Sequence, residues 1–451
     1  MKRLVRFACL LCAACLLFSA CTGPASSLPA SSFEEAGQPQ AADPFSQGTL
    51  TLASSPSGLI GSKYTSSPDG CYEIKDHGTG PYHSLLYIDY ATRQRVYLSD
   101  NPAAGHKDES DPSYVGDTYG GLYQFFIDGK LYLYKCTSPL LLEINDYPSA
   151  YLSCILQMDP DGRNRKTLFT VPANAYVDET SAFAYDGGAL YFMMDELDEN
   201  GDRTAVSLMR VDTATGQQAA LHTFADNARY YLVGAHGGSL VLKQLTLPTP
   251  KGQYPTTEEW LQQKHCLLLY CPATGQMKEL FSWTQGELDG FCYQNGFYYI
   301  DAATASLRRL DLFSGKTETL LAQITDPDSG KPYGYVDAYR IYDGRLLLQT
   351  SDENHEHSDY LAFKLDDASL TRLTLQGDDG FASIWGESET EFLVKTGRIY
   401  FTQRALGPQN TEYLFESDAP AFSMIAKEDY WNNIPNFIPV EDHVFNAKVV
   451  E

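Results

Sequence analysis

Acidic and aromatic residues recur in the long connections of this sequence, each at or just before the first apolar run of a repeated unit. Carboxylates beside aromatic faces suit the binding of a sugar, a peptide or a cationic ligand. The candidate binding residues are Asp117, Tyr119, Asp178, Tyr230, Asp289, Tyr335, Asp337 and Trp385. The alternative is that the aromatic side chains pack between sheets and that the acids are solvated.

Known catalytic patterns are missing from the sequence, which holds no GxSxG elbow, Walker loop, GxGxxG or HExxH motif. Acids from separate repeats could still assemble into a hydrolase or lyase that acts on polysaccharide. Such chemistry needs two carboxyl groups about 5–10 Å apart, and Asp117 with Asp337 is one pair that could supply them. Binding without catalysis is favoured, and no cofactor is expected.

Two acidic segments have partial metal-binding patterns. Residues 195–202 resemble the start of an EF-hand loop, but Glu196 stands at the first position and Ser207 at the twelfth, so the bidentate carboxylate is missing. A hairpin turn explains the same residues. His355 and His357 would point to one side of an extended chain, yet no third ligand is fixed nearby. No metal site is therefore predicted.

The cysteines could either form disulfides or be buried as small apolar residues. Cys136 and Cys154 fall on neighbouring predicted strands and could form a disulfide outside the cytoplasm. Cys266 and Cys271 share one predicted strand and face opposite sides, so they should not pair with each other. The alternative for all of them is burial as small apolar residues.

An apolar run, a Gly-containing turn and a second apolar run recur seven times, at a spacing of roughly 50–60 residues. Asp-Gly and Asn-Gly between β-rich runs predict tight hairpins, because Gly and Asn tolerate positive φ. The turns are residues 67–70, 126–129, 185–187, 235–237, 294–296, 342–344 and 395–397.

Each unit holds a second hairpin, which is clearest at residues 155–169, where Asp159-Pro160-Asp161-Gly162-Arg163-Asn164 forms the turn. There the chain resembles the TolB-like and DUF5050-like propeller repeats of bacteria, whose third and fourth strands are joined by a similar Asp-x-Asp-Gly-x-Asn turn. Looser matches are residues 85–98, 208–221, 268–280, 307–320 and 361–373, and the poorest is 413–425. The resemblance spans roughly residues 58–427 and implies a fold rather than a function.

We therefore predict an all-β, seven-bladed β-propeller of four-stranded antiparallel blades, with strands a, b, c and d in chain order. The short a–b and c–d turns would lie on one face, and the long b–c and d–a loops, with the binding residues, on the other. Six blades with an irregular end is the alternative. Residues 49–53 could add a strand to the last blade, and residues 256–265 could form a short helix.

The N-terminus predicts export followed by lipid anchoring. Residues 1–20 combine a basic start with an apolar run too short to span a bilayer. Leu17-Phe18-Ser19-Ala20-Cys21 resembles a bacterial lipobox, which implies acylation of Cys21; an ordinary signal peptide with an incidental cysteine is the alternative. Residues 21–48 predict a flexible tether, or else a coil packed on the body, and residues 49–451 predict the propeller domain.

The formal net charge of −25 argues against a nucleic-acid partner, because binding to phosphates needs clustered Lys and Arg. Lipid chains, rather than surface basicity, would hold the protein at the membrane. We expect an extracytoplasmic lipoprotein whose loop-rich face binds a protein, peptide or glycan. The alternatives are a carbohydrate-active surface hydrolase or lyase with carboxylates at the channel mouth, and a sensory or assembly component of the envelope.

Overall fold

The computed structural model describes residues 43–53, 63–77, 83–99, 106, 110–116, 121–136, 153–178, 180–225, 228–249, 255–351, 358–406, 412–445 and 449–450. All of these belong to one compact unit, Asp43–Glu451. The export signal, Cys21, Asp117, Tyr119, His355 and His357 lie outside the described residues. No helix in the described ranges is both long and apolar enough to cross a bilayer.

Seven consecutive segments of the described chain each form four antiparallel strands. The first three units are β2 (Tyr64–Ser66), β3 (Gly70–Asp76), β4 (His83–Asp89) and β5 (Gln94–Tyr97); β7 (Gly121–Ile127), β8 (Lys130–Cys136), β9 (Cys154–Met158) and β10 (Lys166–Thr170); and β12 (Ala184–Tyr185), β13 (Ala189–Leu197), β14 (Arg203–Asp212) and β15 (Gln218–Ala225).

The remaining four units follow in chain order. They are β16 (Arg229–Gly237), β17 (Ser239–Thr246), β18 (Lys264–Cys271) and β19 (Gln276–Thr284); β20 (Leu288–Tyr293), β21 (Gly296–Asp301), β22 (Ser306–Asp311) and β23 (Thr317–Leu321); β24 (Tyr335–Tyr342), β25 (Arg345–Ser351), β26 (Ser358–Lys364) and β27 (Leu370–Leu373); and β30 (Ser383–Glu387), β31 (Glu391–Leu406), β32 (Glu412–Ala426) and β33 (Ile438–Pro439).

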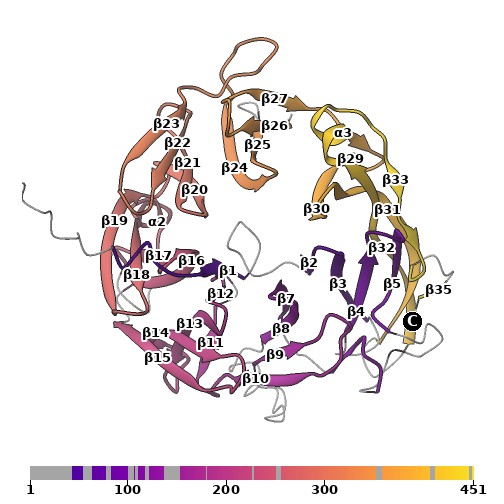
Figure 1. Ribbon diagram of the computed structural model, residues 1–451, viewed down its shortest axis with the longest axis horizontal. Coiled ribbons are helices and arrows are strands. Elements are labelled where there is room, and N and C mark those ends of the chain that lie inside the picture. The colour runs from indigo at the N-terminus through magenta and orange to yellow at the C-terminus, as the bar shows by residue number, and fades with distance from the viewer. Residues whose placement is uncertain are drawn as a thin grey trace, which may run out of the picture. The chain divides into compact units, whose positions relative to one another are not determined.

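These units follow one another around a ring, with first strands such as β16, β20 and β24 nearest its centre (Figure 1). The described chain is thus an all-β propeller, which confirms the predicted fold class. Five units are separate sheets. The third and fourth are joined into one ten-stranded sheet by β1 (Leu50–Leu52), which lies between β12 and β16.

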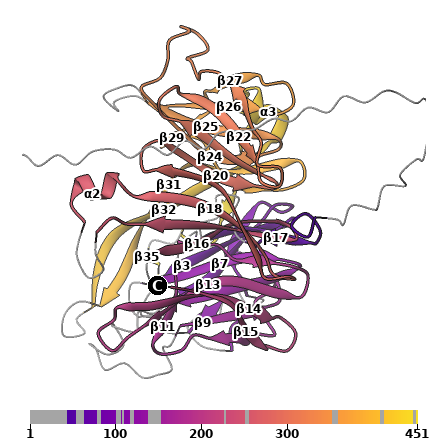
Figure 2. The ribbon, with the colours of Figure 1, turned by 90° about the vertical axis from the view of Figure 1, so that its left-hand side faces the viewer.

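Further short elements lie outside the four-stranded pattern of the units. They are β6 (Tyr114–Val115), β11 (Ala175–Val177), β28 (Gln376–Gly377), β29 (Gly380–Phe381), β34 (Glu441–Asp442), β35 (Val449–Val450), α2 (Thr257–Leu261) and α3 (Lys427–Trp431). Helix α2 falls within the expected residues 256–265 and has a capping box between Thr256 and Glu259. It ends early because strand β18 starts at Lys264. In Figure 2 it projects from the left side of the view.

The predicted hairpin turns form in the first six units. Asp128 and Gly129 have φ of 51° and 68°, and Asp343 and Gly344 have φ of 48° and 68°. Two successive residues with positive φ are what a two-residue hairpin needs to match the right-handed twist of its strands. The local Asp-Gly signal therefore located these turns correctly.

The seventh unit differs from the prediction. Residues 395–397 are not a turn, because β31 runs through them and shifts register between Lys395 and Gly397 in a β-bulge. The bulged Thr396 carbonyl accepts a hydrogen bond from Asp378 N at 2.6 Å, in the small β28–β29 hairpin. Residues 413–425 lie in the single strand β32, and the fourth strand, β33, follows only after α3.

The expected added strand lies elsewhere. Residues 49–53 do not join the last unit, because Thr51 pairs with Tyr185 on one side and His236 on the other. Residues just before it also contact the body: the Phe45 carbonyl accepts hydrogen bonds from Ser239 Oγ at 2.6 Å and Gly238 N at 3.2 Å. The end of the expected tether is therefore packed on the fourth unit.

The ring is closed instead by the C-terminal part of the chain. Strand β34 pairs in parallel with β5, the outer strand of the first unit. Arg95 on β5 is 1% exposed. Its guanidinium donates hydrogen bonds to Glu73 at 2.8 Å, Asp442 at 3.1 Å and the Pro420 carbonyl at 2.9 Å. One buried cation thus links the first unit to the seventh and to β34.

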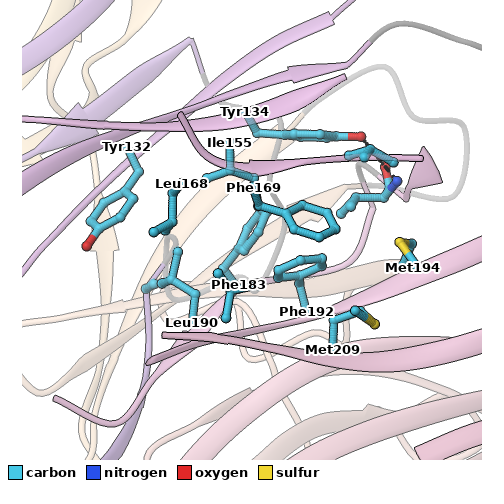
Figure 3. Packing of buried hydrophobic residues seen from close by; sticks show 14 of the residues in the cluster. Tyr132, Tyr134, Ile155, Leu168, Phe169, Phe183, Leu190, Phe192, Met194 and Met209 are labelled. Carbon is cyan, nitrogen blue, oxygen red and sulfur yellow. Dashed lines mark hydrogen bonds between the residues drawn. The ribbon is translucent and has the colours of Figure 1, made fainter. Parts of the chain in front are cut away.

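Aromatic and aliphatic side chains fill the spaces between neighbouring units. Between the second and third units, the rings of Phe169, Phe183 and Phe192 face one another (Figure 3). The ring centroids of Phe183 and Phe192 are 5.3 Å apart, and those of Phe169 and Phe192 are 5.2 Å apart. Each sheet is therefore buried on both faces, which accounts for the apolar strand sequences.

Candidate functional site

A cavity of about 550 Å³ lies between the fourth and fifth units, and the start of the sixth unit also borders it. Strands β16 to β19 line one side, and β20, β21 and the start of β24 line the other. The remaining lining residues are Gln285, Gly286, Ala302, Ala305, Tyr333 and Gly334. They come from two d–a connections and one b–c connection, the loops predicted to carry binding residues.

Apolar side chains form most of the cavity walls. Leu267, Trp283, Phe291 and Phe297 are all buried, and the rings of Trp283 and Phe297 stack with centroids 5.6 Å apart. Such walls exclude water and strengthen electrostatic contacts made by a bound ligand.

Lys243 brings a positive charge into this cavity. It is half-buried on β17, beside Tyr231 in the antiparallel register. Burial lowers the pKa of Lys243, while the charges of Asp289 and Cys292 act to raise it. No hydrogen bond or ion pair within 4.0 Å joins its ammonium group to another side chain in the described part of the chain. It is therefore available to an anionic group of a ligand.

His265 adds a polar group to the same wall. It is 6% exposed, stacks on Trp283 with ring centroids 5.1 Å apart, and its Nε2 lies 2.7 Å from Gln285 Oε1. Burial first, and then the charge of Lys243, lower the pKa of His265, which favours the neutral ring. With Nε2 donating to Gln285, Nδ1 is an acceptor, and it is buried without a hydrogen-bond partner among the described residues.

Two of the predicted residues lie at the rim of the cavity, and a third, Asp337, lies close to them. Asp289 and Tyr335 line it, and both are exposed, Tyr335 by 48%. Asp337 lies two residues further along β24 and is half-buried. Burial and then the charge of Asp289 raise the pKa of Asp337. The three residues come from β20 and β24, so the rule that placed them at the first strand of each unit brought them together.

Asp178 lies at a turn before β12 and does not line this cavity. Its Oδ1 accepts a hydrogen bond from Thr180 N at 2.8 Å. Its charge also acts on Asp195, whose carboxylate is buried beside Tyr176 Oη at 3.0 Å and Arg203 at 3.6 Å. Burial raises the pKa of Asp195 and Asp178 adds to this effect, although Arg203 and Tyr176 oppose it. These contacts hold the third unit together.

Tyr230 and Trp385 are packing residues. Tyr230 is 9% exposed and stacks on Phe224 with centroids 4.0 Å apart. Trp385 meets Tyr64 edge-on at 4.5 Å, between the seventh and first units, and its Nε1 donates to Ser383 Oγ at 2.8 Å. For these two residues the alternative interpretation, packing of aromatic side chains, describes the structure.

Lys243 and His265 were missed from the sequence. Both lie in strands whose other members are largely apolar, so the strand pattern marked them only as interruptions. A polar residue inside a strand that is buried on both faces is the signal that could have found them.

The metal and disulfide expectations can be compared with the described residues. Residues 195–202 form the β13–β14 hairpin, in which Asp198 Oδ1 accepts hydrogen bonds from Asn200 N and Asp202 N, both at 2.9 Å. In the described ranges, no cluster of three or more His, Cys, Asp or Glu residues could hold a metal ion. No disulfide joins Cys154 to Cys136 among the described residues.

The sequence matches no protein-family model and no curated protein. Several solved structures are similar in fold. An oligogalacturonate lyase in complex with manganese has a TM-score of 0.38 at 12% identity, covering 67% of this chain and 72% of that one. TolB from Acinetobacter baumannii has a TM-score of 0.32 at 11% identity, covering 82% and 78%.

A third similar structure is a prolyl endopeptidase, with a TM-score of 0.46 at 11% identity. The match covers 85% of this chain but 55% of the endopeptidase, so this chain spans about half of that protein. Likenesses of this degree identify no activity for this chain.

Proposed function

We propose that this protein is an extracytoplasmic β-propeller lipoprotein that binds a small ligand without transforming it. The observation that carries the proposal is the cavity between the fourth and fifth units, where Lys243, His265 and Asp289 border one space of about 550 Å³. Apolar walls with a few convergent polar groups are typical of ligand sites, whose volumes run from about 300 to 1,000 Å³. The protein, peptide or glycan that carries the ligand group would approach from the d–a and b–c loops.

The experiment is a peptide and glycan array probed with the full-length chain in detergent. Tyr335→Ala should reduce binding at least tenfold, because Tyr335 stands at the rim of the cavity and is 48% exposed. Tyr400→Ala is the matched control, since Tyr400 is 78% exposed on β31 and does not line the cavity. Equal binding by the wild type and Tyr335→Ala would contradict the proposed site.

Lipid anchoring rests on the lipobox-like residues that end at Cys21. Cys21→Ala removes the residue that would be acylated. The protein should therefore move from the membrane fraction to the soluble fraction, because stable anchoring needs two acyl chains and one is marginal. Cys15→Ala, inside the same signal segment, is the control and should leave the protein with the membrane. Retention of Cys21→Ala at the membrane would reject acylation at this position.

A carbohydrate-active hydrolase or lyase is the second candidate, and Asp289 and Asp337 favour it. A carboxyl whose pKa is raised by burial and by a neighbouring carboxylate is suited to act as a general acid beside a second, ionised one. Cleavage of an acidic oligosaccharide by the wild type, lost in Asp337→Asn, would establish this activity. Binding that persists in Asp337→Asn with no cleavage by either protein would favour the first proposal.

A further inference from the structure

The geometry points to a short peptide with free termini as the ligand, with its carboxylate at Lys243 and its ammonium group at Asp289 and Asp337. This inference rests on the ligand-binding function proposed above and names the class of ligand. It uses the fact that the cavity has charges of both signs, which lie at different depths.

The inner charge is positive. Lys243 is half-buried on β17, among lining residues such as Leu267 and Cys292 that are almost fully buried. Elsewhere a buried cation has its carboxylates in place: Arg95 donates to Glu73 at 2.8 Å and to Asp442 at 3.1 Å. Lys243 has no such carboxylate within ion-pair distance in the described chain. A ligand carboxylate would supply the ion-pair partner that Lys243 lacks, because a cation removed from water is stable only when paired.

The outer charge is negative. Asp289 is exposed at the rim, and Asp337 lies on the neighbouring β24. Neither carboxylate forms an ion pair with a Lys, Arg or His side chain in the part of the chain that the structure describes. Two adjacent carboxylates with no ion pair within 4.0 Å among the described residues create a site for a ligand cation, and the ring of Tyr335 at the same rim adds an aromatic face that attracts ammonium groups.

The space between the two charges favours a peptide over a sugar. Its lining includes the apolar Leu267, Trp283 and Phe291. Two of its polar side chains already have partners, since Gln285 bonds to His265 and the Tyr333 hydroxyl donates to Asp359, so few groups remain for sugar hydroxyls. His265 differs from them, because its buried Nδ1 lacks a partner among the described residues and would accept a hydrogen bond from a peptide N–H. A di- or tripeptide with apolar side chains offers a matching group for each of them.

Isothermal titration of the full-length chain in detergent tests the inference with four probes: leucyl-leucine, its N-acetylated form, its C-terminal amide, and D-glucuronate. Leucyl-leucine should bind at least tenfold more tightly than each blocked form, because each blocking group removes one charge contact. Lys243→Met should bind leucyl-leucine and its amide equally, and the double variant Asp289→Asn with Asp337→Asn should bind leucyl-leucine and its acetylated form equally. Lys243→Arg should restore the preference for a free carboxylate.

Lys316→Met is the matched control, because Lys316 is exposed in the turn between β22 and β23 and should bind as the wild type does. Leucyl-leucine binding no tighter than its blocked forms, or an unchanged preference in Lys243→Met, would overturn the inference. Glucuronate binding that is lost in Tyr335→Ala would overturn it while leaving the proposed ligand site intact. No binding by any probe, together with negative peptide and glycan arrays, would reject both.

Discussion

Arg95 and Lys243 are both withdrawn from water, and each needs a compensating negative charge. Protein carboxylates supply this charge to Arg95 and so stabilise the fold, whereas a ligand would supply it to Lys243. Arg95 meets Glu73 and Asp442, and although burial acts to lower the pKa of Arg95, these carboxylates raise it overall. Lys243 lacks such partners, and burial lowers its pKa. A buried charge with full compensation holds a structure together, whereas one without it remains ready for a ligand.

A surface charge cluster on the first unit gives a prediction about acid stability. Burial alone would raise the pKa of Asp76, but hydrogen bonds from His83 and Lys63 lower it to about 2. The unfolded value is about 3.9, so the folded state favours the ionised form, and its stabilisation is present above about pH 4 and lost as the pH falls towards 2. Asp76 is 52% exposed, which limits the effect to below about 1 kcal/mol.

Urea unfolding of the wild type and Asp76→Asn over this pH range is the measurement. The wild type should be the more stable protein at about pH 6, and the difference should shrink below pH 4 and disappear as the pH falls through about 2. Asp366→Asn, which changes an exposed carboxylate in the β26–β27 turn, is the control for the loss of one surface charge. A difference that grows as the pH falls would contradict the assigned sign.

Position along the chain pointed to part of the candidate site, whereas the other two polar lining residues were missed. Asp289, Tyr335 and Asp337 were found because the start of each first strand borders the ring centre, which is a property of the repeat. Lys243 and His265 lie in the second and third strands of the fourth unit, and their role depends on the fifth unit packed against them. Contacts between units cannot be derived from spacing within one unit.

At the scale of elements, local sequence determines turns well and strand ends poorly. Asp128-Gly129 makes the predicted turn because each residue tolerates a positive φ. Gly397 was predicted to do the same, but the long partner strand β32 and the β28–β29 hairpin continue the pairing of β31 through that point. Tertiary pairing thus overrode the local turn signal in the seventh unit.

The packing of residues 43–48 on the fourth unit gives a prediction at this scale. A Cβ at Gly238 would overlap the carbonyl oxygens of Gln47 and Pro44. Gly238→Ala should therefore displace this segment and lower the free energy of unfolding by about 1–3 kcal/mol, the usual effect of overpacking. Limited proteolysis should cut residues 43–53 faster in the variant than in the wild type.

Gly188→Ala serves as the control, since the atom nearest to its added Cβ would be Asp186 Oδ1 at 3.8 Å. It lies in the equivalent hairpin of the third unit, so it tests the general effect of replacing a turn glycine. Equal protection of residues 43–53 in the wild type and Gly238→Ala would show that this segment does not depend on the close approach.

At the scale of the whole ring, the repeat was predictable and its closure was not. Six of the seven predicted turns form from local sequence, whereas β34 pairs with β5 across most of the sequence and consists of two residues. Likewise β1 lies between the third and fourth units rather than in the last one, although its apolar pattern suits either place. A short strand with an ordinary apolar pattern does not specify its pairing partner. The sheet edges that the rest of the fold leaves unpaired decide where it pairs.

The closure depends on Arg95, which gives a prediction for the whole molecule. Arg95→Met would leave the carboxylates of Glu73 and Asp442, which are 3% and 7% exposed, buried without their cation. Breaking a buried ion pair on one side lowers stability by about 3–5 kcal/mol. Urea unfolding should show this loss, and cleavage near β34 should accelerate because the strand is no longer held to β5.

Two further variants separate charge from packing. Arg398→Met removes an exposed arginine from Asp379 and Asp418, so it should change stability by at most about 1 kcal/mol. Adding Glu73→Gln to Arg95→Met removes one of the two buried charges that Arg95 compensates and should recover part of the loss, since the uncompensated charge of Glu73 is a main source of it. No recovery in the double variant would mean that the arginine acts through its ring contacts with Phe422 and Phe445 instead of through its charge.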